Sequence, residues 1–91
     1  MDIESIKRAI VVNVYHIPES EKVPLHKHPQ NDEVFYCIKG TGYGVMEDRE
    51  VELAAGQAFI VPAGTKHSLR TDGDLYVTSF LIPKAEEAQP K

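Results

Sequence analysis

Three of the four histidines in this sequence, His26, His28 and His67, have spacings that suit a metal site. His26 and His28 are two residues apart, so on an extended strand their side chains point to the same face, with Cα atoms about 6.5–7 Å apart. Both imidazoles can then reach one metal ion at about 2.1 Å. A histidine on a strand is more often a surface residue or a satisfied core residue, so the pair alone is weak evidence.

Two further residues strengthen the metal interpretation. Glu33 follows His28 after Pro-Gln-Asn-Asp, a turn-like sequence that can bring the carboxylate back beside the pair. His67 follows a second turn, residues 62–66. Burying three imidazoles and a carboxylate in a small core would cost several kcal/mol, and a divalent cation removes that cost. The four residues together are therefore far more specific than any one of them.

The rest of the sequence consists of short apolar or alternating runs separated by turns, which is typical of a sandwich or barrel. Gly40-Thr41-Gly42 is expected to end one strand, and the polar residues 47–49 to form a hairpin turn. Residues 2–9 are the only helix candidate. We expect seven to nine strands, the clearest at residues 10–17, 33–39, 43–47, 50–53, 58–61, 67–71 and 75–82.

Length and composition limit the class of protein. The 91 residues suit one small domain, which we expect at residues 10–82, between an N-terminal segment at 1–9 and a polar tail at 83–91. The net charge of −4 disfavours nucleic acid or an anionic membrane as a partner, and no apolar run approaches the ~20 residues of a membrane span. The single Cys37 excludes an internal disulfide, so we expect a cytoplasmic protein.

The two histidine segments resemble the two sequence motifs of the cupin family. The first motif, G-x5-H-x-H-x3,4-E-x6-G, is matched by His26, His28, Glu33 and Gly40, with Ser20 in place of the leading glycine. The second, G-x5-P-x-G-x2-H-x3-N, is matched by Gly56, Pro62, Gly64 and His67, with Thr71 in place of the final asparagine. Neither departure removes a potential metal ligand.

The resemblance implies an all-β jelly-roll barrel (a double-stranded β-helix) with one internal site. By position, its metal ligands would be His26, His28, Glu33 and His67. Such a donor set suits Fe, Mn, Ni, Zn or Cu rather than Ca or Mg, and the sequence does not choose among them. Metal affinity should fall below about pH 6.5, and each ligating imidazole should place its other N–H on a carbonyl, carboxylate or water.

The family resemblance leaves several functions open. It suggests a metal-dependent enzyme of the dioxygenase, isomerase, decarboxylase or epimerase type that acts on a small polar molecule. No separate catalytic acid–base pair is recognisable, so the metal would carry the chemistry. The alternative is a non-catalytic module that binds metal or a small ligand, because one fold hosts both kinds of function. A third possibility is a barrel without metal that serves as a scaffold for a partner.

Side-chain alternation predicts which residues face inward. If Glu33 points inward, Phe35 and Cys37 do so too. If His67 points inward, Leu69 and Thr71 follow, and Ser68 and Arg70 are left outside.

The same alternation leaves an apolar outer face formed by Val34, Tyr36 and Ile38. Such a face needs a cover, and we predict a homodimer that packs there. The alternative is that residues 2–17 of the same chain cover it.

Four other residues have two interpretations each. His16 either approaches the pocket or lies at its rim or on the surface, and Cys37 is expected to be a core residue rather than a ligand. Lys66 and Arg70 either attract an anionic substrate or are simply solvated.

Overall fold

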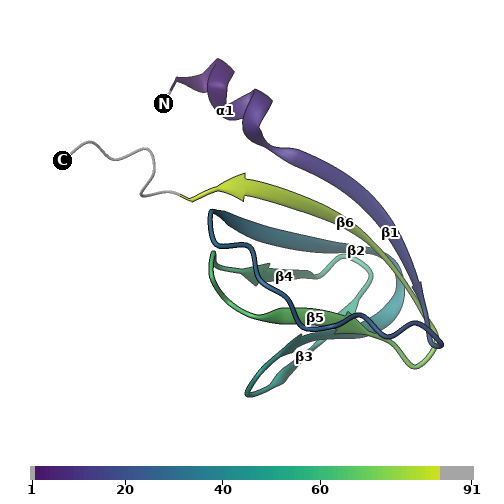
Figure 1. The fold of residues 1–91 in the computed structure, drawn as a ribbon. Coiled ribbons are helices and arrows are strands. Elements are labelled where there is room, and N and C mark those ends of the chain that lie inside the picture. Colours follow the sequence, from purple (N-terminus) through teal and green to yellow (C-terminus); the bar gives the residue numbers. More distant parts are fainter. Residues whose placement is uncertain (1, 85–91) are drawn as a thin grey trace.

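The computed structural model describes residues 2–84, which form one short helix and six antiparallel strands (Figure 1). Residues 85–91 of the predicted tail lie outside the described residues, and the domain limits stay a prediction. The helix is α1 (Ile3–Ala9), and the strands are β1 (Val11–Pro18), β2 (Asn31–Met46), β3 (Glu50–Ala54), β4 (Ala58–Val61), β5 (His67–Arg70) and β6 (Asp74–Pro83).

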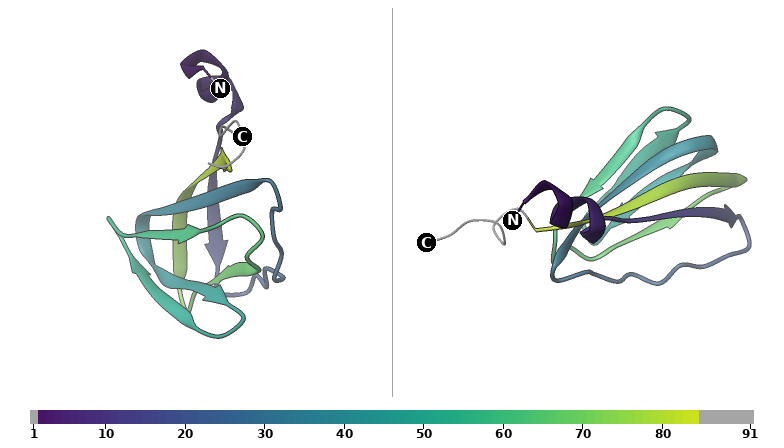
Figure 2. Two further views of the ribbon diagram at one scale, coloured as in Figure 1. Left: turned by 90° about the vertical axis from the view of Figure 1, so that its left-hand side faces the viewer. Right: turned by 90° about the horizontal axis from the view of Figure 1, so that it is seen from above.

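The helix begins where the sequence predicts. The Asp2 side chain accepts a hydrogen bond from the Ser5 backbone N–H at 2.8 Å, which caps the first turn. No residue of α1 is buried, and the helix projects beyond the ends of the strands (Figures 1 and 2). Within the described residues, no helix is long and apolar enough to cross a membrane.

The long strand β2 joins the two layers of the molecule. Its first half pairs with β6 on one side and β4 on the other, and β6 pairs in turn with β1. Its second half pairs with β3 and β5 to form the second layer. The views in Figures 1 and 2 show the strands curving around a common interior, with the segment 19–30 running along the open side.

The expected strand end at Gly40-Thr41-Gly42 is wrong, because the chain bends there without leaving the sheet. The pairing of β2 with β6 shifts register between Cys37 and Lys39, which is the mark of a β-bulge. Gly40 follows with φ +83°, and a Cβ at this position would lie 2.1 Å from the Asp74 carbonyl oxygen. Only glycine fits, so it bends one strand across both layers.

The expected seven to nine strands become six within residues 2–84 for the same reason. Two predicted strands fuse into β2, whereas the predicted hairpin of β2 and β3 is confirmed, with a turn closed by Met46 N–H donating to the Arg49 carbonyl at 2.8 Å. The segment of His26 and His28 is not a strand, although a single bridge joins His26 to His67.

The interior forms as alternation predicts, with one exception. Inward positions of β2, β5 and β6 are buried, and they make up most of the core. Ser68 was expected outside but is only 5% exposed, because segment 19–30 lies beside β5, with His26 bridged to His67. The Ser68 hydroxyl donates to the Val23 carbonyl at 2.6 Å across that contact. The buried apolar residues are Ile17, Phe35, Cys37, Leu53, Phe59, Val61, Leu69, Leu75 and Val77.

The outer face of the layer that contains β1, β6, β2 and β4 is apolar and open. Register aligns one row of apolar side chains across all four strands, namely Val12, Phe80, Val34 and Ile60. Tyr36 and Ile38 are 44% and 46% exposed, as predicted. The alternative that residues 2–17 cover this face is wrong, since β1 lies beside β6 in the same sheet and adds exposed valines of its own.

Candidate metal centre

The structure brings together all four side chains that the sequence singled out. His26 and His28 come from segment 19–30, Glu33 from the start of β2 and His67 from the start of β5. Backbone hydrogen bonds hold the segments in place: His26 and His67 exchange two, at 3.0 and 2.8 Å, and Gly64 N–H donates to the His28 carbonyl at 3.0 Å. These bonds tie the segment of His26 and His28 to the turn before His67 and to the start of β5.

The cluster has the dimensions of a metal site. One potential ligand atom from each of the four residues lies within 4.8 Å of the others. Donor atoms bound to one ion at about 2.1 Å are separated by at most roughly 4.2 Å, so closure on an ion needs shifts of less than about 1 Å. Three imidazoles and one carboxylate fit a divalent transition metal in chemical type as well.

Glu33 is the electrostatic centre of this cluster, with a residue exposure of only 5%. Its Oε1 accepts from His67 Nε2 at 2.9 Å and lies 3.2 Å from His28 Nε2, and its Oε2 accepts from the Ser79 hydroxyl at 2.5 Å. Burial by itself raises the pKa of Glu33, but the hydrogen bonds from His67 and Ser79 and the charges of the histidines outweigh it and lower the pKa. The carboxylate is therefore held ionised.

His67 shows the matching shift in the opposite direction. Burial lowers the pKa of this imidazole, but its bonds to Glu33 and to the Thr65 carbonyl outweigh burial, so its pKa is raised. The Thr65 contact, Nδ1 to oxygen at 2.9 Å, leaves Nε2 aimed at the cluster. His26 has the same arrangement, with Nδ1 at 3.0 Å from the Pro24 carbonyl. Both rings have the carbonyl partner that metal-binding histidines usually have.

A cavity of about 260 Å³ opens beside the cluster. Its walls come from β1, β2, β5, β6 and the covering segment, so residues far apart in sequence enclose one space. The lining residues are Tyr15, His16, Ile17, Glu21, Val23, His26, His28, Glu33, Phe35, Ser68, Leu69 and Leu81.

Sequence reasoning missed two kinds of site residue. Ser79 donates a hydrogen bond to the Glu33 carboxylate. The sequence could have indicated this residue, because Ser79 is a polar residue that alternation places on the same inward face as Leu75 and Val77. Tyr15 of β1 and Glu21 of segment 19–30 line the cavity, but nothing local in the sequence marks them, because their places depend on the pairing of β1 with β6 and on the path of segment 19–30.

The residues with open interpretations now have definite positions. His16 lines the cavity but lies outside the four-residue cluster: its Nε2 is 2.8 Å from Asp74 Oδ1, and its ring stacks on Tyr76 at 4.3 Å. Cys37 is fully buried, burial raises the pKa of its thiol, and it is not among the clustered ligands.

Lys66 and Arg70 do not face the cavity. The Lys66 ammonium lies 3.9 Å from Glu47, and the Arg70 guanidinium makes two hydrogen bonds to Glu50, at 2.7 and 2.8 Å. Arg70 also lies over the Tyr43 ring at 4.0 Å. Neither residue therefore attracts an anion to the cluster from its present position.

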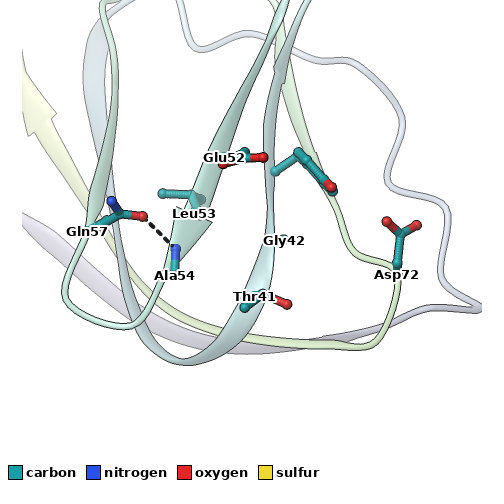
Figure 3. Close-up of a pocket in the computed structure, with 8 residues that line it drawn as sticks. Thr41, Gly42, Glu52, Leu53, Ala54, Gln57 and Asp72 are labelled. Atoms are coloured by element: carbon teal, nitrogen blue, oxygen red, sulfur yellow. Dashed lines mark hydrogen bonds between the residues drawn. The ribbon is translucent and has the colours of Figure 1, made fainter.

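A second hollow, of about 240 Å³, lies on the β2–β3 side and contains none of the four clustered residues. Figure 3 shows its walls, with the Gln57 side chain turned back to accept a hydrogen bond from the Ala54 N–H at 2.8 Å. Glu52 and Asp72 stand at its edges (Figure 3).

Comparison with known proteins identifies the class. The chain matches the model of the cupin domain over residues 13–82, and it belongs to the cupin family. The all-antiparallel architecture is accordingly a jelly-roll, or double-stranded β-helix, barrel. A solved structure of a predicted oxalate decarboxylase from Thermotoga maritima superposes with a TM-score of 0.77 over 91% of this chain and 75% of that one, at 24% identity.

Curated relatives are similar over part of their length. Quercetin 2,3-dioxygenase of Bacillus subtilis is 34% identical over 55 residues, which is 60% of this chain and 16% of that protein. An oxalate-binding protein of Thermotoga maritima is 29% identical over 58 residues, 64% of this chain and 48% of that protein. This chain thus spans less than half the length of either relative.

The paired shifts of Glu33 and His67 predict how the stability of metal-free protein depends on pH. A lowered pKa means that Glu33 stabilises the fold above its ordinary value of 4.5 and loses this effect as pH falls through the lowered pKa. A raised pKa means that His67 stabilises the fold below 6.5 and loses this effect as pH rises through the raised pKa. Urea unfolding of chelator-treated protein should show the largest contribution of the pair between these values.

Ser79→Ala provides the control for this profile. Without the Ser79 hydroxyl the pKa of Glu33 rises. The loss of stability at low pH should therefore begin at a higher pH than in the wild-type protein, whereas the loss at high pH, which depends on His67, should be unchanged. The free energy of unfolding of the wild-type protein should differ from that of Glu33→Gln by an amount that changes with pH. A difference that is constant across this pH range would contradict the electrostatic description.

Proposed function

We propose that His26, His28, Glu33 and His67 bind one divalent transition metal, and that the chain is a metal-dependent enzyme acting on a small molecule. One observation carries the proposal: four donor atoms from three separate segments converge within 4.8 Å at the wall of an open cavity. Fe, Mn, Ni, Zn and Cu all suit this donor set, whereas Ca and Mg prefer all-oxygen sites.

The cavity supplies the space in which such an enzyme works. If the four residues held a six-coordinate ion, two positions would remain for a substrate and water, and the ion would polarise a bound oxygen or acidify water. Phe35 and Leu69 form an apolar wall that limits water near the reacting atoms. Glu33, held by Ser79, stays ionised and would offset one of the two positive charges of the ion. Dioxygenase, isomerase and decarboxylase chemistry all fit this arrangement, and similarity to a dioxygenase supports the first.

The second candidate is a non-catalytic module that holds a metal or a small ligand. Its support is the similarity to a protein named for oxalate binding. The fold hosts both functions, so the chemistry at the open metal positions has to decide.

We further propose that the apolar outer face packs against a second copy of the chain. The row of Val12, Phe80, Val34 and Ile60 crosses four strands without a charged residue, and Ile60 is 64% exposed. Exposed apolar patches of this kind usually mark an interface. The cytoplasm is our proposed location, because a fully buried, unpaired Cys37 suits a reducing compartment.

Removal of one ligand tests the metal proposal. His26→Ala should lower metal affinity at least about 100-fold, more than loss of an outer partner does. The measurement is elemental analysis of tag-free protein, followed by competition with a chelator. His16→Ala is the matched control, since His16 lines the same cavity outside the cluster and its loss should leave metal content unchanged. Full metal occupancy in His26→Ala would show that the ligand assignment is wrong.

Access to the open metal positions separates enzyme from binding module. Protein loaded with Mn²⁺ should enhance water-proton relaxation through a fast-exchanging bound water, and reconstituted protein should convert at least one of a panel of catechols, thiols and keto acids, followed by O2 uptake and by NMR. Neither signal should persist in His26→Ala. If wild-type protein shows no exchangeable water and no conversion, the enzyme proposal fails and the binding module stands.

Two exposed isoleucines test the dimer. Analytical ultracentrifugation at micromolar concentration should give the mass of two chains. Ile60→Lys places a charge in the outer face and should weaken association by at least about 30-fold. Ile3→Lys changes an isoleucine of similar exposure on α1, 68% against 64%, and should leave the dimer intact. A monomeric wild-type mass would rule the dimer out.

A further inference from the structure

The charge of the cavity beside the metal cluster restricts what can bind there. Among the described residues that line it, none is lysine or arginine. Lys22 and Lys27 belong to the segment that covers the cavity, but both are exposed and neither lines it. Lys66 and Arg70 are paired with Glu47 and Glu50 elsewhere. An anionic ligand would therefore find no lysine ammonium and no arginine guanidinium in the described cavity wall.

The carboxylates of the cavity strengthen this effect. Glu33 belongs to the metal cluster, and Glu21 stands in the cavity wall, exposed and without an ion pair among residues 2–84. These two charges balance those of a divalent ion, while the histidines are neutral as ligands. Any further negative charge on a ligand would then face Glu21 without compensation.

The remaining wall is apolar. Ile17, Phe35 and Leu69 are each at most 5% exposed, so they are part of the core as well as part of the cavity surface. Ser68 also lines the space, but its hydroxyl is already donated to the Val23 carbonyl. A ligand that fills the 260 Å³ cavity therefore contacts mostly carbon over its body. The polar groups that it can contact include the four-residue cluster, Glu21 and Tyr15.

From this arrangement we infer that the site takes an uncharged or cationic small molecule with an apolar body, and that it discriminates against ligands with a carboxylate or phosphate beyond the metal-binding head. The inference rests on the proposed metal function and names the substrate class of the same site. A ligand amine or hydroxyl is recognised by Glu21, and the body is desolvated against the apolar wall. Compact dianions such as oxalate lack both contacts.

A matched series of chelators tests the charge preference. 4-Ethylcatechol, 3,4-dihydroxybenzylamine and 3,4-dihydroxyphenylacetate share one metal-binding head and one ring, and each tail is attached to the ring through a CH2 group. In Co²⁺-loaded protein, titrated by visible absorption, the amine should bind at least about tenfold tighter than the carboxylate, with the neutral compound between them. Equal or tighter binding of the carboxylate would overturn the inference.

Variants of Glu21 locate the cause. Glu21→Gln should remove most of the preference for the amine, and Glu21→Lys should reverse the order of amine and carboxylate. Glu19 provides the matched control, because it is an exposed glutamate of the same segment that does not line the cavity. Glu19→Lys should leave the order unchanged. An equal effect of both lysine variants would mean that general surface charge, not the cavity, sets the preference.

The failure of this inference can be told apart from failure of the metal proposal. Metal content is measured first, by elemental analysis, and it bears on the metal proposal alone. The same three compounds are then added to metal-free protein, and the methyl NMR signals of Leu69 and Leu81 report occupation of the cavity. The amine-over-carboxylate order should persist there with weaker affinities. Its absence in both states would overturn the charge preference even if metal binds fully.

Discussion

The central constraint on this molecule is a buried carboxylate that must stay ionised. Glu33 lies in the core at 5% exposure, and such a charge is tolerated only with partners. His67, His28 and Ser79 supply them, from three other parts of the chain. Every buried side-chain nitrogen or oxygen of the described residues has a hydrogen-bond partner. Hydrogen bonds alone therefore satisfy the polar atoms of the cluster. The same residues thus support the fold without metal.

The barrel positions the partners of Glu33 around its carboxylate. The bend at Gly40 lets one strand belong to both layers. The first half of β2 carries Glu33 and pairs with β6, and the second half pairs with β5, which carries His67. The reciprocal backbone bonds of His26 and His67 then close the open side. The segment that carries His26 and His28 also buries Ser68 and contributes Glu21 to the cavity wall, so it shapes the site and covers the barrel at once.

Much of the site could be predicted from local sequence. Turn composition before Glu33 and His67, together with the spacing of His26 and His28, was enough to select the four residues that the fold brings together, and whether they bind metal stays a prediction. Alternation also gave the inward set correctly for Glu33, Phe35 and Cys37. It failed at Ser68 because alternation describes a strand with one solvated face, and the irregular segment 19–30 contacts Ser68 through the Val23 carbonyl.

The sequence by itself determined the class of the fold, the residues of the cluster and the apolar character of the outer face, since these follow from side-chain type and short spacings. Only the tertiary structure decided that Gly40 bends a strand rather than ending it, that Ser79 holds Glu33, and that Lys66 and Arg70 turn away from the cavity while Glu21 enters its wall. The reason is physical: each depends on backbone or charge contacts between segments tens of residues apart, and such contacts leave no periodic pattern in the chain.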